Sequence, residues 1–274
     1  MKNFLINCII FLLIFVGMVI LGRPLFWEPL QEFLTHVEVV PEEFETNLAY
    51  ATEHAEFDIE DITAIDGLLG LLPYMNEEVS PIGEIIIPTV DIHLPILHGA
   101  TNVNMSLGAG TLDPDDRMGE GNFGLASHWM PQPGLLFASL HEVEIGDMLF
   151  LRDAHYVYVY EIFENKVVDI YRGDVLDNVE GRILVTLVTC TPDMLQRVIV
   201  QGELVDRLTI EDILSATAED NADVVDMIEM AEILTPVVVT FPILEVGAVG
   251  GGAFLLASFI VWISNRGVRK RQDK

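Results

Sequence analysis

Two long stretches without a charged residue limit the fold of this chain more than any other feature. The first, residues 4–21, has 18 residues, and the second, residues 246–265, has 20 residues. About 20 apolar residues are enough for a helix to cross the hydrocarbon core of a bilayer. We therefore expect residues 4–21 and 246–265 to form two transmembrane helices in a lipid membrane.

Each stretch also has a second interpretation. The first resembles the apolar part of a secretory signal peptide, but such parts usually have about 7–15 residues and end at a small-residue cleavage site. No such site precedes Arg23. The second stretch begins with several glycines and is compatible with a buried helix. The basic run 266–271 follows it at once, however, which favours a membrane anchor.

Charged residues are distributed very unevenly along the chain. It contains 14 Lys and Arg against 43 Asp and Glu, which gives a net charge of -29. Only seven of the basic residues, but 42 of the acidic ones, lie between Arg23 and Arg266. Basic residues beside a membrane helix favour the cytoplasmic side. We therefore expect residues 1–3 and the tail 266–274 in the cytoplasm, with the acidic middle outside the cell.

The same acidic balance excludes one class of function. A protein that binds nucleic acid needs Lys and Arg to neutralise phosphates. With a net charge of -29, this chain is not expected to bind nucleic acid.

The middle of the chain divides into three parts. Residues 24–81 are acidic and show helix-like apolar spacing at 62–72, which predicts a stalk and an N-terminal helix. Residues 82–210 contain short β-branched or aromatic runs separated by turn residues, typical of an all-β sandwich or barrel. Residues 211–245 predict an acidic helical linker. The runs in the β part are 85–87, 92–97, 147–151, 156–162, 166–170, 183–188 and 198–204.

Cys190 is the candidate nucleophile of the exported part. The only other cysteine, Cys8, lies in the first apolar stretch, so no disulfide framework is expected. A lone cysteine is most often a small buried hydrophobic residue. It becomes a nucleophile where a base and a cation lie beside it.

Arg197 and one histidine are the candidates for that cation and that base. If the runs on either side of residues 191–195 form a hairpin, Cys190 and Arg197 face one another. Arg197 then stabilises a developing oxyanion, unless it only relieves the local acidity. His128 follows a glycine-rich segment at an expected strand-to-loop corner, but spacing does not favour it over His98 or His141. The histidines of this region are His36, His54, His93, His98, His128, His141 and His155.

The segment TLVTC at 186–190, followed by Arg197, resembles the TLxTC…R signature of the sortases, cysteine transpeptidases of the Gram-positive cell surface. Further similarity extends over residues 82 to 207 and is closest to the class A, or housekeeping, sortases. The resemblance implies an eight-stranded β-barrel with short helices, which is mainly β and occupies residues 82–210. The similar segments are 83–88, 94–96, 101–104, 108–111, 125–128 and 197–204.

The resemblance also implies roles for individual residues. Cys190 matches the nucleophile that attacks the Thr–Gly bond of an LPXTG-type sorting signal and forms a thioacyl enzyme. His128 matches the general acid and base, and Arg197 matches the arginine that holds the substrate and stabilises the oxyanion. Ala126 and Thr189 match positions that line the substrate site. The implied partners are surface proteins with sorting signals and a peptidoglycan-precursor amine that resolves the thioacyl enzyme.

A pilin-polymerising, class C-like sortase is the alternative, with a pilin lysine as the acceptor. A C-terminal membrane span is commoner in that class. Class C enzymes usually carry a lid with an Asp-Pro-aromatic motif ahead of the barrel, whereas the only Asp-Pro here is Asp113-Pro114, inside the barrel region. We therefore favour class A-like wall anchoring.

No cofactor is expected. Calcium activates some class A enzymes, but scattered carboxylates such as Glu142, Glu144 and Asp147 usually form a solvated surface, so we assign no metal ligands.

Overall fold

The computed structural model describes residues 17, 37, 39–54, 57, 65, 68–74, 77–169 and 173–216. The chain divides into two compact units, residues 31–235 and residues 1–30 with 236–274, and all described residues except Gly17 belong to the first. The expected membrane helices, apart from Gly17, the basic tail and the linker beyond residue 216 lie outside the described residues. In the described part, no helix is both long and apolar enough to cross a membrane.

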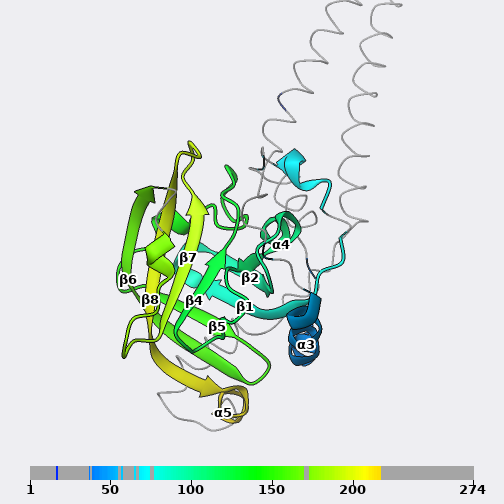
Figure 1. Ribbon diagram of the computed structural model, residues 1–274, viewed down its shortest axis with the longest axis vertical. Helices are drawn as coiled ribbons and strands as arrows, with labels where there is room; N and C mark the ends of the chain where they lie inside the picture. The colour runs from blue at the N-terminus through cyan, green and yellow to red at the C-terminus, as the bar shows by residue number, and fades with distance from the viewer. Residues whose placement is uncertain are drawn as a thin grey trace, which may run out of the picture. The chain divides into compact units, whose positions relative to one another are not determined.

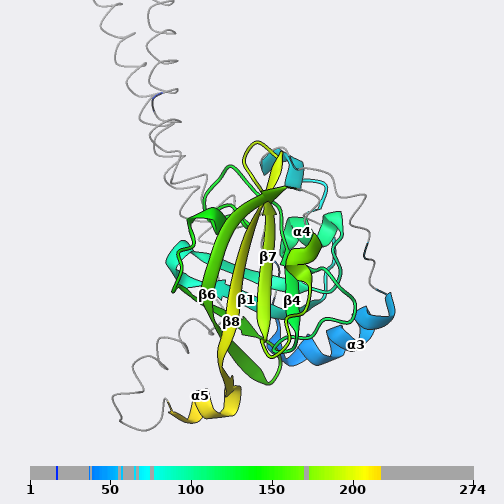
Figure 2. The same ribbon diagram turned by 60° about the vertical axis from the view of Figure 1, so that its left-hand side comes forward.

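A closed barrel of eight strands forms the centre of the unit of residues 31–235 (Figures 1 and 2). The strands follow one another around the barrel in the order β1-β2-β3-β4-β7-β8-β6-β5. The pairs β2–β3 and β4–β7 are parallel and the others are antiparallel. The expected mainly β, eight-stranded barrel is therefore confirmed. The strands are β1 Pro81–Ile87, β2 Ile92–Leu97, β3 Ala109–Thr111, β4 Asn122–Ala126, β5 Met148–Arg152, β6 Tyr156–Asp169, β7 Leu184–Cys190 and β8 Gln196–Thr209.

Short helices lie outside the barrel. A helix of the predicted N-terminal part, α3, lies at Phe44–His54. Residues 62–64, 66 and 67 of the segment with apolar spacing lie outside the described residues, so a helix there stays a prediction. Of that segment, residues 68–71 form a single 3-10 turn. α3 packs on β1, where Asn47 Nδ2 donates a hydrogen bond to Pro81 O at 2.8 Å and Phe44 is buried. The other helical elements are α4 Asn102–Leu107, α5 Ile210–Ala216, η1 Pro41–Glu43, η3 Leu68–Leu71, η4 Pro88–Val90, η5 Leu140–Glu142 and η6 Gly173–Leu176.

Strand boundaries differ from the sequence prediction in two places. β6 is one strand across 156–169, where two runs were predicted, because register shifts near Tyr160 and Glu164 keep the polar stretch between the runs paired with β8. A β-bulge adds a residue and bends a strand without ending it. The short strands β3 and β4 were not among the predicted runs. Both contain glycine and few β-branched residues, so their β propensity is low.

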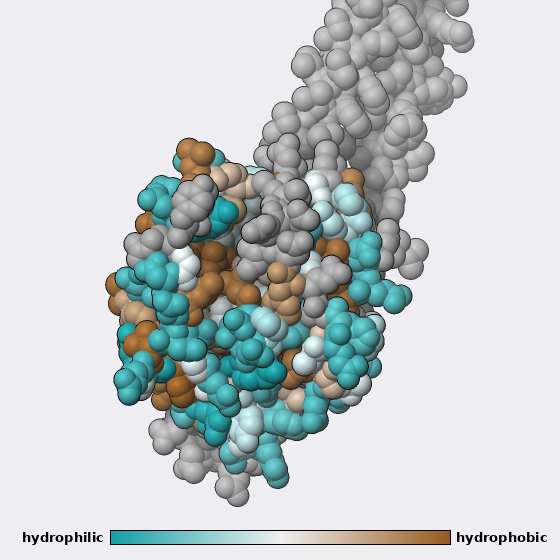
Figure 3. Space-filling model, viewed as in Figure 1, coloured by the Kyte–Doolittle hydropathy of each residue, from teal (hydrophilic) through white to brown (hydrophobic). Residues whose placement is uncertain are grey.

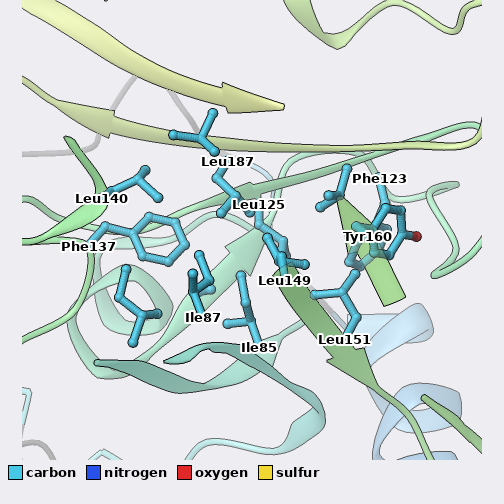
Figure 4. Packing of buried hydrophobic residues seen from close by; sticks show 14 of the residues in the cluster. Ile85, Ile87, Phe123, Leu125, Phe137, Leu140, Leu149, Leu151, Tyr160 and Leu187 are labelled. Carbon is cyan, nitrogen blue, oxygen red and sulfur yellow. The ribbon is translucent and has the colours of Figure 1, made fainter. Parts of the chain in front are cut away.

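Alternation along the strands separates an inner face from an outer face. Successive side chains of a strand point to opposite faces of a sheet. On β7, Val185 and Leu187 face the core, so Thr186, Val188 and Cys190 lie on the outer face. Figure 4 shows large apolar side chains of several strands converging on this core, which closes the barrel from within.

Candidate active site

The end of β4 carries the candidate histidine to the end of β7. β4 and β7 pair in parallel, with Ala126 opposite Val188. Two hydrogen bonds extend the contact: Ser127 N donates to Val188 O at 3.2 Å, and Thr189 Oγ1 donates to Ser127 O at 2.8 Å. His128 directly follows Ser127 in the chain, and Cys190 directly follows Thr189. The strand pairing therefore brings residues 62 positions apart in sequence to the same end of the sheet.

The hairpin of β7 and β8 places Cys190 opposite Arg197, as predicted. Residues directly opposite in an antiparallel pair project to the same face. Val198, the next residue on β8, belongs to the core, so Arg197 and its partner Cys190 both lie on the outer face. The structure thus brings the cysteine and the arginine side by side.

The loop that joins β7 to β8 is tightly bonded. Thr191 Oγ1 donates to Asp193 Oδ1 at 2.6 Å, and the same carboxylate oxygen accepts a hydrogen bond from Leu195 N at 3.1 Å. Met194 has a φ of 62°, which closes the turn. These bonds fix the distance between the ends of the two strands, and so the approach of Cys190 to Arg197.

His128 is buried without a partner. Its side chain is 3% exposed, and in the described part of the chain its Nε2 has no hydrogen-bond partner. Burial lowers the pKa of His128 from 6.5 to about 4, because desolvation disfavours the imidazolium form. A buried polar atom without a partner costs about 1–3 kcal/mol. The imidazole is therefore neutral at pH 7 and able to accept or donate a proton when a substrate brings a partner.

Cys190 and Arg197 form a partly exposed pair. Burial raises the pKa of the Cys190 thiol, while the positive charge of Arg197 lowers it. The guanidinium has one hydrogen bond, from Nη1 to Gln196 O at 3.2 Å, and no carboxylate partner within the described ranges. Arg197 thus retains donors for a second ligand. At neutral pH the resting site consists of a neutral thiol, a neutral imidazole and a free cation.

Apolar side chains lie on the outer face of the sheet near Cys190, where Ala126 and Ile199 are buried and Val188 is partly exposed. Two small clusters share Val188, one with Ala126 and Met105 and the other with Ile199 and Val175. We call the residues Ala126, Val188 and Ile199 the outer strip. Figure 3 shows hydrophobic side chains among hydrophilic ones on the face of the molecule where β4 and β7 lie in Figure 1. An apolar surface beside a nucleophile is suited to an extended peptide.

The two residues expected to line the substrate site occupy different positions. Ala126 is buried in the cluster that contains Val188, two residues before His128. Thr189 is buried, and its hydroxyl is bonded to Ser127 O, where it supports the chain leading into His128. Contact of either residue with a substrate stays a prediction.

The competing histidines have structural partners. His98 Nδ1 lies 3.2 Å from Thr111 Oγ1, and its ring meets Phe57 edge to face at 5.2 Å between centroids. His141 Nδ1 lies 3.0 Å from Ala138 O. These contacts distinguish both residues from His128.

Sequence reasoning missed two polar neighbours of His128. Trp129 Nε1 and Gln132 Oε1 are buried and have no hydrogen-bond partner among the described residues. Trp129 directly follows His128 and Gln132 lies four positions after it, but no pattern in the sequence distinguished either residue.

No metal site is evident in residues 39–54, 77–169 and 173–216. Within those ranges, no group of three or more His, Cys, Asp or Glu side chains could hold an ion. Asp147 Oδ2 accepts a hydrogen bond from Glu144 N at 2.8 Å, so one of the carboxylates considered above stabilises a turn.

Comparison with known proteins identifies the family of this chain. The sortase domain model matches residues 85–205. Sortase A of Bacillus anthracis is 30% identical over 208 residues, which are 74% of this chain and 96% of that protein. Sortase A of Listeria monocytogenes is 28% identical over 208 residues, 73% of this chain and 92% of that protein.

A solved structure shares the fold. Sortase C-3 of Streptococcus pneumoniae matches with a TM-score of 0.50 and 18% identity, over 66% of this chain and 91% of that one. From the family model and the Sortase A relatives together, the chain belongs to the sortase family and is a cysteine transpeptidase.

Proposed function

We propose that this sortase is anchored in the cell membrane and cleaves LPXTG-type sorting signals, joining the released protein to an amine of a peptidoglycan precursor. One observation carries the proposal. Strand pairing brings Cys190, Arg197 and the buried His128, whose Nε2 has no hydrogen-bond partner among the described residues, to the same end of one sheet, beside Val188. The match to Sortase A proteins over more than nine-tenths of their length supports the class A-like assignment.

The acylation step uses all three residues. The Cys190 thiolate attacks the carbonyl carbon of the Thr–Gly bond, and the negative charge that develops on the oxygen is stabilised by the Arg197 guanidinium. The C–N bond then breaks, and the His128 imidazolium gives its proton to the leaving amine. The products are a thioester on Cys190 and the free amino terminus of the cleaved segment.

The second step reverses the proton movements. The acceptor amine attacks the thioester carbon, and neutral His128 accepts the proton that the amine loses. The C–S bond breaks and Cys190 leaves as the thiolate, so a new amide bond joins the surface protein to the acceptor. No external oxidant or cofactor is needed for this sequence.

The pKa directions determine which form of the pair reacts. Because the pKa of His128 is lowered to about 4 and that of Cys190 is raised, most molecules hold a thiol and a neutral imidazole near pH 7. The reactive thiolate–imidazolium form carries the same number of protons, so its share is constant between the two pKa values. Arg197 favours this form by lowering the pKa of the thiol.

The proposed location depends on the ends of the chain. The uncharged stretches 4–21 and 246–265 and the basic tail 266–274 support two membrane spans with both termini in the cytoplasm. The catalytic barrel then lies outside the cell, next to its wall precursor. Digestion of intact cells with an external protease is expected to remove the barrel and leave a tag at either terminus protected; a digested terminal tag contradicts this topology.

The test of the activity uses full-length protein in detergent micelles with an LPXTG peptide and an added amine. Cys190→Ala is expected to lower turnover by about 10⁴-fold or more, because the nucleophile is lost. The matched control is Cys8→Ala, which removes the only other cysteine and leaves turnover unchanged. Mass spectrometry of the wild type is expected to show the thioacyl adduct on Cys190. Normal turnover by Cys190→Ala contradicts the proposal.

The choice of acceptor is tested in the same assay. A short amine that mimics the peptidoglycan precursor is compared with a lysine-bearing pilin peptide at equal concentration. Faster transfer to the first supports wall anchoring. Faster transfer to the lysine side chain replaces it with the pilin-polymerising alternative.

A further inference from the structure

A buried polar cluster lies on the outer face of the barrel, behind the outer strip. We call Asn122, Thr186 and Gln201 the polar staple. They come from β4, β7 and β8, and all three are buried. Thr186 Oγ1 donates to Asn122 Oδ1 at 2.7 Å and accepts a hydrogen bond from Gln201 Nε2 at 2.9 Å. The three side chains thus form one continuous network across neighbouring strands.

The polar staple is bonded to the connection between β6 and β7. Asn122 Nδ2 donates to Val175 O at 3.0 Å and to Asp177 O at 3.1 Å, and Gln201 Nε2 donates to Val175 O at 3.0 Å. Buried backbone carbonyls need partners, and connections between strands usually find them in solvent. Here side chains of three strands supply them, so the turn η6 is fixed on the sheet.

η6 closes the outer strip on the side away from Cys190. Val175 and Leu176 pack with Ile199 and Val188. Leu176 also covers β4, where a Cβ on Gly124 would lie 3.2 Å from its Cδ2. Along the outer face of β7, Thr186 is fully buried beneath this turn whereas Cys190 is partly exposed. The covered part of the face therefore ends where the candidate active site begins.

We propose that Asn122, Thr186 and Gln201 are positioning residues for peptide binding, which hold η6 as a preformed wall of the site. The inference rests on the proposed function, because the wall would bound the part of a sorting peptide that precedes the scissile bond. Val188 is the partly exposed residue of the outer strip, and Leu176, also partly exposed, packs in the same cluster. A peptide that reaches Cys190 along β7 would contact Val188 and then meet Leu176. A wall fixed in advance lowers the ordering cost of binding. It has no effect on the bonds made and broken at Cys190.

The test separates binding from chemistry in the full-length enzyme. Thr186→Val removes the hydroxyl and preserves the shape of the side chain, whereas Thr186→Ser keeps the hydroxyl. Thr186→Val is expected to raise KM for an LPXTG peptide about five- to tenfold and to change kcat less than about twofold, as the loss of one or two net hydrogen bonds predicts. Thr186→Ser is expected to restore KM. The rate of Cys190 alkylation by iodoacetamide is expected to stay at the wild-type value in both variants.

A matched control removes another asparagine side chain that is hydrogen-bonded to loop carbonyls. Asn122→Ala is compared with Asn165→Ala, because Asn165 Nδ2 also donates to two loop carbonyls, Val143 O at 2.7 Å and His141 O at 3.3 Å. Asn165 is opposite the core residue Val200, on the other face of the sheet from the polar staple. Asn122→Ala is expected to raise KM, and Asn165→Ala to leave it unchanged. An equal rise in both variants overturns the inference.

Other outcomes also decide the question. An unchanged KM in Thr186→Val, or a fall in kcat alone, overturns the inference while the wild-type turnover still supports the proposed function. If Thr186→Val does not fold, Gln201→Met tests the same bonds, and hydrogen exchange should be faster at Leu176 and Asp177 than in the wild type. Unchanged exchange there overturns the inference. Failure of the wild type to cleave any sorting peptide counts against the proposed function instead.

Discussion

Two polar clusters lie on the outer side of the same barrel. They differ in whether their ionisable side chains have hydrogen-bond or ion-pair partners among the side chains of the described residues. On β1, the carboxylate of Glu84 meets His93 Nε2 at 2.9 Å and Arg152 Nη1 at 3.3 Å. At the end of β7, His128 Nε2 has no partner and Arg197 has only a backbone carbonyl among the described residues. We call them the β1 cluster and the β7 cluster.

The difference indicates what each cluster is for. A buried carboxylate that is paired on two sides contributes to the stability of the native state through its partners. A buried imidazole and a cation without such partners cost stability, and such sites are retained where function requires them. The comparison predicts that changes in the β7 cluster reduce activity more than stability, and that changes in the β1 cluster do the reverse.

The largest effect is expected at Arg197. Arg197→Ala should lower kcat/KM about 10²–10³-fold, because the oxyanion loses its charged donor. Arg197→Lys should recover only part of this, since an ammonium lacks the two-pronged geometry of the guanidinium. Steady-state kinetics and a thermal melt of the same samples check both statements. A variant that keeps full kcat/KM would remove Arg197 from the proposed mechanism.

Next comes Glu84, in the β1 cluster. Glu84→Ala should lower the free energy of unfolding by about 3 kcal/mol, because the buried carboxylate that pairs with both His93 and Arg152 is lost. Turnover per folded molecule should stay within about twofold of the wild type. Urea denaturation measures the first quantity, and kinetics at low temperature the second. Loss of activity without loss of stability in Glu84→Ala would show that the β1 cluster serves activity and not stability.

A slightly smaller effect is expected from the titration of His128. Its pKa is about 4 in the folded state against 6.5 for an unperturbed histidine, so the unfolded chain binds the proton more readily as the pH falls below 6.5. Burial of neutral His128 should therefore cost ~2.5 kcal/mol of stability at pH 4.5 relative to pH 8. His128→Gln should lack this loss, which denaturation curves at both pH values can measure. Parallel curves for the two proteins would refute the lowered pKa.

The same pKa values predict a broad pH profile of kcat/KM. Activity should fall below about pH 4, where His128 is protonated while Cys190 remains a thiol. It should fall again above the raised pKa of Cys190, where His128 can no longer donate a proton to the leaving amine. A narrow optimum near pH 6.5 would contradict the assignment of these two groups.

The smallest effect is expected at an exposed ion pair. Glu203 accepts a hydrogen bond from Arg182 Nε at 3.0 Å on the surface of β8. Glu203→Ala should shift the thermal midpoint by less than about 2 °C and leave kcat/KM unchanged, because solvent screens such pairs. It serves as the matched control for Glu84→Ala. A shift as large as that of Glu84→Ala would show that burial is not what distinguishes the β1 cluster.

Part of the fold was predictable from local patterns. Runs of β-branched residues correctly indicated β1, β2, β5, β7 and β8, because β-branched side chains favour the extended backbone of a strand wherever they occur. The short strand β4 escaped prediction because Gly124 and its neighbours lack that pattern. Helix α3 was not predicted at its observed position, because its sequence FETNLAYATEH is mostly polar and has little apolar spacing.

The site was predictable only in part. The pairing of Cys190 with Arg197 was predictable because the two residues are only seven positions apart and a short loop joins their strands. The structure confirms this pairing. The choice of His128 over His98 and His141 did not follow from spacing, and was made through the resemblance to the sortases. Its position beside β7 depends on a parallel strand pair, which no local pattern encodes.

The sequence by itself therefore determined most of the strands, the cysteine–arginine hairpin and the family. The tertiary structure decided which histidine lies at the end of β4 beside β7, how deeply it is buried and which carbonyls of the β6–β7 connection are bonded to the polar staple. The physical reason is that burial, and with it the pKa of His128, depends on residues distant in sequence that meet only when the barrel closes. The propensity to form a strand depends on a few neighbouring residues in sequence. Desolvation of a side chain depends on all residues that surround it in the folded protein.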